Sequence, residues 1–299
     1  MKTMLALVGL FLIGCDCSIG AQAQESLAWK FEKGQKFTLQ TQQQTQSLVS
    51  FGAKQIPSNV DLLLSVSWEV QAAEAEQFTI EQTVDFIRIE MKGQGEASLT
   101  YDSREKKAVV GAAKDLATAV APVLGTKSTF TMTPQGEVAP VAPAAAEPPK
   151  EAEPASPAKE KDLRKESISQ LLKQSLLPLP QAFEGSMPTW TDVRETTAAL
   201  GKVKQTRKFT FAGNEDRDGK PAAKITVQGE LELTPPAAVK TPPKLKQQSL
   251  SGTVWFSRES GRALSSETTQ KIVTESMYRD SSITVEVTTT IKNTLSPRE

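Results

Sequence analysis

The stretch that determines the fold is Val60–Met91, which reads VDLLLSVSWEVQAAEAEQFTIEQTVDFIRIEM. Apolar and polar residues alternate along Leu62–Val70, which is the period-2 pattern of a half-buried strand. The pattern repeats along Phe78–Phe86, after a turn at Ala72–Glu76. The apolar face then shifts by one residue at Ile87–Met91, and one extra residue of this kind is what a β-bulge supplies. The stretch therefore predicts two long antiparallel strands, with a bend in the second.

The length of these strands indicates the fold class. Strands of roughly 11 to 15 residues exceed the usual length of about 5 to 6 and belong to coiled sheets, sandwiches or barrels. We therefore expect a mainly β fold of the α+β class, built on a long curled antiparallel sheet or half-barrel. A parallel α/β fold is disfavoured because strand and helix units do not alternate along the chain.

The residues before this hairpin also follow strand patterns. Leu27–Phe31 alternates up to a turn at Gly34, and Phe37–Ser50 forms the next strand. This next strand is polar on both faces in its middle, so its register is weakly specified and we expect it at or near an edge. Shorter strands are expected at Ala97–Tyr101 and Phe130–Met132.

Two segments have helical periodicity. Apolar residues recur at helical spacing between Gly111 and Gly125, where Pro122 should kink or end the helix. A second amphipathic helix is predicted at Ile168–Leu176 and ends at the prolines that follow. We expect the sheet to close over these two helices.

A linker divides the chain. Residues 138–161 consist mainly of Pro, Ala, Glu and Lys, and they cannot bury enough apolar surface to offset their ordering entropy. They separate a β-rich N-terminal half, residues 24–137, from a C-terminal half of one helix and several strands, residues 162–299. The halves could form one sheet or two smaller β-rich domains.

Strand patterns resume after Trp190. They lie at Val203–Phe211, Ile225–Leu233, Leu250–Phe256, Ala263–Val273 and Ile283–Ile291.

The N-terminus resembles an export signal. Lys2 precedes an apolar run at Met4–Ile13 that is too short to span a bilayer. Two processing sites compete: a lipobox that would lipidate Cys15 after a leader of residues 1–14, and an A-x-A site that would cut after Ala23. We expect a protein exported to the periplasm or cell envelope, attached to a membrane only if Cys15 is lipidated.

Composition excludes several kinds of chemistry. Lys+Arg and Asp+Glu balance at 35 each, so no global positive field predicts a nucleic-acid partner. The chain has no histidine, which removes Ser-His-Asp, Cys-His and HExxH sites. We therefore expect no catalytic residues, no cofactor and no enzymatic activity.

One acidic cluster resembles the start of a calcium loop. Asn214, Asp216 and Asp218 alternate ahead of Gly219, but Ile225 occupies the position where that motif needs a bidentate Glu. The Asp-Gly pair between two strands favours a hairpin turn. We expect no metal site, with these three residues as weak cation ligands at most.

The four tryptophans could line a ligand cavity. Each stands in or beside strand-patterned sequence, so core packing is the favoured interpretation for Trp29, Trp68, Trp190 and Trp255.

Short motifs also carry a family resemblance over most of the mature chain. They are Tyr101-Asp102-Ser103, Phe130-Thr131, Pro134-x-Gly136-Glu137-Val138, Leu177-Pro178-Leu179-Pro180, Gly185, Trp190, Gly252-x-Val254-x-Phe256 and Gly261-Arg262-Ala263-Leu264. In this order they resemble a family of exported bacterial proteins of unknown function, which tends to have Asp where this chain has Ser257. That family has no assigned activity, so the resemblance implies no catalytic residue.

The expected architecture is also similar to the half-barrels of periplasmic lipoprotein carriers. In those proteins a curled antiparallel sheet wraps around helices and shelters an acyl chain, so the resemblance implies a lipid ligand by analogy of fold alone.

Three functions fit the sequence. The first is a non-catalytic envelope protein that binds an apolar ligand, such as a lipid, or another exported protein. The second is a structural or adhesive envelope module with residues 138–161 as a spacer. The third is a hydrolase that uses carboxylates, which would require two acidic side chains converging in a cleft.

Overall fold

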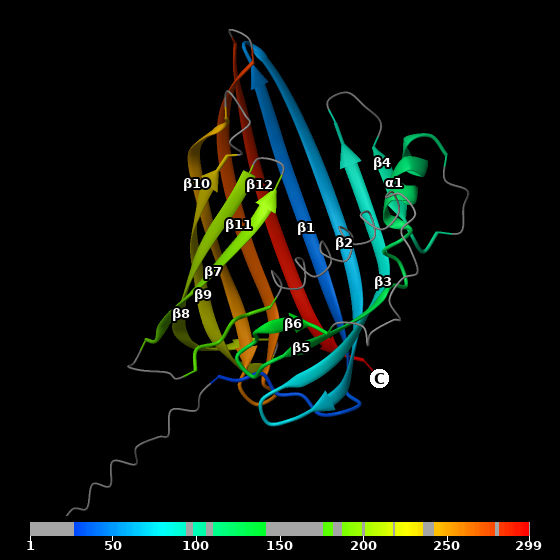
Figure 1. Cartoon of the computed structure of the whole chain (residues 1–299), viewed down its shortest axis with the longest axis vertical. Helices are drawn as coiled ribbons and strands as arrows, with labels where there is room; N and C mark the ends of the chain where they lie inside the picture. The colour runs from blue at the N-terminus through cyan, green and yellow to red at the C-terminus, as the bar shows by residue number, and fades with distance from the viewer. Residues whose placement is uncertain are drawn as a thin grey trace, which may run out of the picture.

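A computed structural model describes most of the chain (Figure 1). The described residues are 27–93, 98–105, 110–141, 176–181, 187–198, 201–217, 219–235, 242–278 and 281–298. Cys15 and Ala23, residues 142–161 of the predicted linker, and nearly all of the second predicted helix lie outside them.

Within the described residues, twelve strands form one antiparallel sheet. Its order is β6-β5-β3-β2-β1-β12-β11-β10-β9-β8-β7, and β4 pairs with β3. The strands are β1 Lys36–Phe51, β2 Lys54–Ala73, β3 Phe78–Lys92, β4 Leu99–Asp102, β5 Lys127–Met132, β6 Val138–Pro140, β7 Thr189–Ala198, β8 Gly201–Arg217, β9 Lys220–Thr234, β10 Lys244–Ser257, β11 Arg262–Tyr278 and β12 Ser281–Pro297.

The predicted hairpin at Val60–Met91 is confirmed as β2 and β3. The predicted bulge is also present, because Ser65 pairs with Phe86 and Val66 pairs with Val84, which leaves Asp85 between them. The buried face of β3 accordingly moves from Val84 to Ile87. Asp85 is therefore the extra residue that the shift in the sequence pattern predicts.

The two halves of the chain share the sheet. β1 pairs with β12 from Phe37 opposite Pro297 to Phe51 opposite Ile283, and β1 pairs with β2 on its other side. The prediction that β1 lies at or near an edge is wrong. Its polar middle does not mark an edge, because both neighbours saturate its backbone hydrogen bonds and fix its register.

The predicted strand at Leu27–Phe31 is an irregular segment instead. Its side chains are buried, but the Trp29 backbone N–H donates to the Pro134 carbonyl at 2.8 Å and that of Lys30 to the Gly261 carbonyl at 2.9 Å. The segment therefore bonds to two turns and joins no ladder.

Two strands were not predicted. β7 follows Met187 and pairs with β8, and β6 occupies Val138–Pro140, the first residues of the predicted linker. The linker prediction is thus wrong at its start, since these residues extend the sheet from β5.

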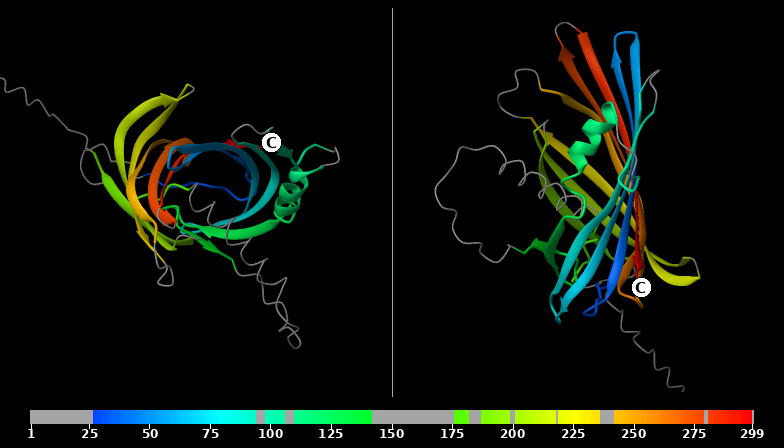
Figure 2. Two further views of the ribbon diagram at one scale, coloured as in Figure 1. Left: turned by 90° about the horizontal axis from the view of Figure 1, so that it is seen from above. Right: turned by 90° about the vertical axis from the view of Figure 1, so that its right-hand side faces the viewer.

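The sheet curves but stays open, with β6 and β7 at its two ends. The described residues contain one helix, α1 at Ala112–Val120, which ends before Pro122 as expected. Figure 2 shows it beside β3 and β4, and none of its residues is fully buried. The prediction of a half-barrel closed over two helices is therefore wrong in its closure, while the mainly β class is confirmed.

A floor closes one end of the sheet, at the bottom of Figure 1. We use this name for Leu27–Phe31, Pro134–Gly136 and Leu176–Leu179. The Trp29 indole N–H donates to the Leu177 carbonyl at 3.0 Å, and the Leu179 backbone N–H donates to the Gln135 carbonyl at 2.7 Å. Three segments far apart in sequence therefore meet there.

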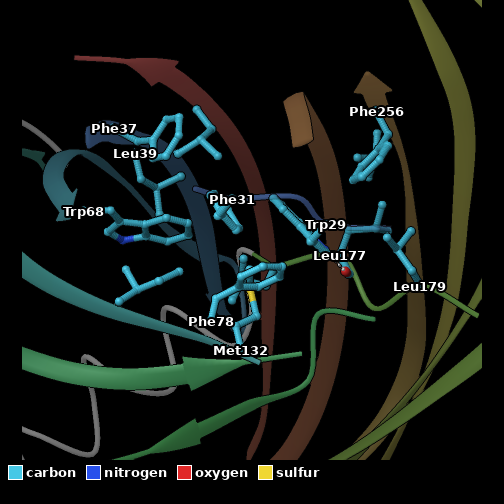
Figure 3. Close-up of a cluster of buried hydrophobic side chains, with 14 of the residues drawn as sticks. Trp29, Phe31, Phe37, Leu39, Trp68, Phe78, Met132, Leu177, Leu179 and Phe256 are labelled. Carbon is cyan, nitrogen blue, oxygen red and sulfur yellow. Dashed lines mark hydrogen bonds between the residues drawn. The ribbon is translucent and has the colours of Figure 1, made fainter. Parts of the chain in front are cut away.

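Aromatic side chains pack the floor against the strands (Figure 3). Trp29 meets Phe256 edge to face at 5.5 Å between ring centroids, and Phe31 contacts Phe37 and Phe78 at 5.4 and 5.2 Å. Edge-to-face pairs add to the stabilisation from apolar burial. These aromatic contacts thus gather at the closed end of the sheet.

Gly136 allows the floor to form, and its replacement is a test. A Cβ there would lie 2.5 Å from the Leu177 carbonyl oxygen and 2.8 Å from Trp29 Nε1, at a φ of +82°. We expect Gly136→Ala to lower the free energy of unfolding by about 3 kcal/mol, because it adds a backbone clash to a left-handed conformation. Urea denaturation followed by tryptophan fluorescence measures this loss.

Gly125→Ala is the matched control. Gly125 has a φ of +69°, but no atom lies within 4 Å of an added Cβ. Its replacement should therefore cost only about 1 to 2 kcal/mol, for the left-handed conformation alone. Equal losses in the two variants would contradict the packing assigned to Gly136.

Candidate functional site

One face of the sheet lines two cavities and is here called the inner face. On β1 it carries Leu39, Thr41 and Gln43. The pairing extends each of these positions into a row across the sheet, since Thr41 lies opposite Asn293 of β12, which lies opposite Ser266 of β11. Each row therefore occupies one depth above the floor.

The smaller cavity, of about 110 Å³, lies against the floor. Trp29, Trp68, Leu176 and Leu177 contribute apolar walls to it, and Figure 3 shows Trp29 against Leu177. Both indoles are at most 2% exposed. Trp29 and Trp68 thus pack in the core, as expected, and also line a cavity.

A hydrogen-bonded polar row crosses the inner face above this apolar layer. Thr41 Oγ1 donates to Asn293 Oδ1 at 2.8 Å, and Asn293 Nδ2 donates to Ser266 Oγ at 3.2 Å. Thr41 and Asn293 are buried. Buried polar groups persist in a core when they are paired, so this row is a stable boundary between the apolar floor and the space above it.

The larger cavity, of about 510 Å³, lies beside β7 to β11. Its lining is rich in aliphatic side chains, which are Val138, Val203, Leu231, Leu233, Leu245 and Ile272. Val138 comes from β6 and Asp192 from β7, so the two ends of the sheet line the same cavity. Gln205 and Gln270 line both cavities and define the junction between them.

Charged side chains gather at this junction. Asp192 Oδ2 accepts hydrogen bonds from Arg194 Nε at 2.8 Å and from Arg207 Nε and Nη2 at 3.1 and 2.6 Å. Arg207 lines the smaller cavity, whereas Asp192 and Arg194 line the larger one. Burial, and secondly the positive charge of Arg207, lower the pKa of the Arg194 guanidinium to about 10 against the opposing effect of Asp192. Arg194 therefore remains protonated at neutral pH.

This arrangement combines aliphatic walls with directed cationic donors. A guanidinium presents its N–H groups in a fixed fork that matches carboxylate or phosphate oxygens. The site can thus hold an elongated apolar group and a polar group at the same time.

The predicted cation ligands belong to a hairpin. Asn214 and Asp216 lie on β8, opposite Ala223 and Pro221 of β9. An Asp216 carboxylate oxygen accepts the Gly219 backbone N–H at 2.8 Å, which gives it a role in the turn. Asp218 lies outside the described residues. Within the part of the chain that the structure describes, no group of three His, Cys, Asp or Glu side chains is placed to hold a metal ion.

The other two tryptophans line neither cavity. Trp190 stacks on Phe209 at 5.5 Å and donates its indole N–H to the Pro178 carbonyl at 2.7 Å. The Arg217 guanidinium lies 4.3 Å above the Trp255 ring. Trp190 thus packs against the core, as expected. Trp255 is half-buried between the buried Val254 and Phe256, so the core-packing prediction is wrong for it.

The charge cluster was not predicted from the sequence. Arg207 belongs to the basic stretch Lys202–Lys208, yet its side chain is buried. The alternation along β8 was the available signal. Arg207 lies on the same face of the strand as Val203 and Phe209, whereas Lys208 lies on the opposite face. The position of Asp192 opposite Arg207 results from the pairing of β7 with β8, which cannot be predicted from the periodicity of the sequence.

No helix among the described residues has the length and apolar composition that crossing a membrane would require.

Comparison with solved structures gives two weak matches. No protein-family model and no curated protein sequence matches the chain. A structure of lipovitellin that concerns its lipid–protein interactions is similar with a TM-score of 0.46 and 9% identity, over 90% of this chain and 26% of that one. A DUF1329 family protein from Desulfovibrio piger has a TM-score of 0.18 and 10% identity, over 89% of this chain and 85% of its own. The chain spans about a quarter of the lipovitellin chain, and neither match assigns it a function.

The ion cluster predicts a non-additive pair of substitutions. Asp192→Leu should lower the free energy of unfolding by about 2 kcal/mol, because it leaves two guanidinium groups facing each other. Asp192→Leu combined with Arg207→Leu should recover at least half of that loss, since the second change removes one buried charge. Urea denaturation of the single and double variants measures the coupling.

An exposed ion pair supplies the control. Lys271 Nζ lies 2.6 Å from Glu286 Oε1, and both side chains are more than a third exposed. Glu286→Leu should change the free energy of unfolding by less than about 0.5 kcal/mol. Additive effects of the Asp192 and Arg207 substitutions would refute the coupling.

Proposed function

We propose that this protein is a non-catalytic exported envelope protein that binds an apolar or amphipathic ligand on the inner face of its sheet. The observation that carries the proposal is the pair of cavities that meet at Gln205 and Gln270. The larger volume, about 510 Å³, falls within the usual range of small-molecule sites, about 300–1,000 Å³.

The aliphatic lining supports this proposal energetically. Val203, Leu231, Leu233, Leu245 and Ile272 face the cavity and are only half-buried. A ligand that covers them would remove apolar area from water, which stabilises a complex by about 25 cal/mol per Å² before the costs of association.

The N-terminal sequence supports the compartment. The run at Met4–Ile13 and the competing sites at Cys15 and Ala23 are features of an exported chain. Lipidation at Cys15 would tether the sheet to a membrane and place it beside a source of acyl chains, whereas cleavage after Ala23 would release it.

Native mass spectrometry tests both parts of the proposal. The protein, expressed with its own leader and recovered gently from the envelope, should carry an additional small-molecule mass and should begin at a lipidated Cys15 or at Gln24. A bare mass that gains nothing after incubation with a lipid extract, or a mass of two chains without lipid, would contradict ligand binding.

A cavity-filling variant tests the location. We expect Gln270→Trp to weaken the binding of a fluorescent fatty-acid analogue by about tenfold or more, because Gln270 lines both cavities. Fluorescence titration of the purified, delipidated chain measures the affinity.

Thr269→Trp is the matched control. Thr269 is the next residue on β11 and contacts Thr290 on the opposite face at 3.1 Å. The Thr269→Trp variant should bind the analogue with an affinity within about twofold of that of the unchanged protein, because the new indole would lie outside the cavities. Equal weakening by both variants would argue against the inner face as the site.

A further inference from the structure

We infer that the ligand is an anionic amphiphile, with its carboxylate or phosphate head held by Arg207 at the junction and its tail in the larger cavity. This inference rests on the proposed function and specifies the ligand class of the same site.

The donors of Arg207 are the first observation. Its Nε and Nη2 both donate to Asp192 Oδ2, and its Nη1 meets no acceptor among the described residues. The side chain is 11% exposed and lines the smaller cavity. Two contacts hold the Arg207 guanidinium in place. One is with the Asp192 carboxylate, and the other is with the Phe209 ring, whose centroid lies 5.3 Å from the guanidinium carbon. Nη1 is therefore a fixed donor for an oxygen that enters the cavity.

The surroundings of Arg207 favour an anion over a neutral head. Arg194 and Arg207 converge on a single carboxylate oxygen in a site with apolar walls, and the other carboxylate of the lining, that of Glu137, is exposed to water. Low local polarity strengthens charge–charge attraction and weakens its screening by salt. The lowered pKa of the Arg194 guanidinium, caused mainly by burial and then by Arg207, reflects the same environment.

Neutral donors lie beside the cation. Gln205 precedes Arg207 by two residues on the inner face of β8, and Gln270 reaches the same junction from β11. Each carboxamide can donate two hydrogen bonds. A head with two or three oxygens would thus find donors from more than one strand.

The lining of the larger cavity selects the tail. Its apolar members are aliphatic side chains and Pro178, without an aromatic ring among the lining residues. A flexible hydrocarbon chain can follow such a wall, whereas a planar ring system gains most from stacking on aromatic faces. A single acyl chain is accordingly the tail that these walls fit.

Three probes separate the head from the tail in the unchanged protein. Calorimetric titration should show that oleate binds at least about tenfold more tightly than oleyl alcohol, which has the same chain and no charge. Inorganic phosphate should neither bind detectably nor displace oleate, because it lacks a tail. Added salt should weaken the binding of oleate more than the binding of oleyl alcohol.

Arg207→Gln tests the assigned donor, with Lys208→Gln as its control. Both remove one positive charge from neighbouring residues of β8, but Lys208 is exposed on the outer face. We expect Arg207→Gln to lower the affinity for oleate by about tenfold or more and the affinity for oleyl alcohol by less than about twofold. Lys208→Gln should change neither affinity. Arg207→Lys is the second test if Arg207→Gln proves unstable. Because it keeps the positive charge, it should retain most of the preference for oleate over oleyl alcohol.

The outcomes distinguish the two proposals. Equal affinities for oleate and oleyl alcohol, unaffected by Arg207→Gln, would overturn the anionic head and leave the proposed function standing. Tight binding of inorganic phosphate alone would show a free-anion site and overturn the amphiphile. Failure of both oleate and the alcohol to bind would overturn the proposed function as well.

Discussion

The structure depends above all on the hydrogen bond from the Trp29 indole N–H to the Leu177 carbonyl. It joins residues 148 positions apart, and both groups are buried, so either would lose its partner without gaining water if the contact opened. Gly136 lies against both groups, which locks the Pro134–Gly136 turn into the same contact. The floor therefore forms as a unit, and it closes one end of a sheet whose strands would otherwise leave both ends of the inner face open.

Much of this sheet follows from the sequence because side-chain alternation is a local property. Val66, Trp68 and Val70 alternate with polar residues whatever their neighbours are, so β2 is visible without its partners. The bulge at Asp85 is visible for the same reason, since it changes the phase within one strand. The packing of Trp29 and Trp68 was likewise predictable, whereas their additional contact with a cavity depends on what lies opposite.

The candidate site was predictable only in part, because it is created by the pairing of strands. Arg207 has the phase of a buried residue, but its partner Asp192 belongs to β7, a strand that the sequence pattern did not reveal. The edge prediction for β1 failed for a related reason. A strand that is polar on both faces is rare in the middle of a sheet unless one face meets a polar layer, and Thr41 meets one in Asn293.

The floor and the charge cluster are physically coupled. The smaller cavity reaches from the floor, which closes its lower end, to Arg207 at the junction with the larger cavity. Attraction between charges grows as water is removed. The half-exposed aliphatic wall above the floor contributes less to stability than a packed core would, since its apolar area stays in contact with solvent. A ligand that covers this wall would stabilise the folded chain by mass action. An anionic head bound by Arg207 would add to that effect, because the buried guanidinium and its apolar surroundings screen the attraction between charges less than water does.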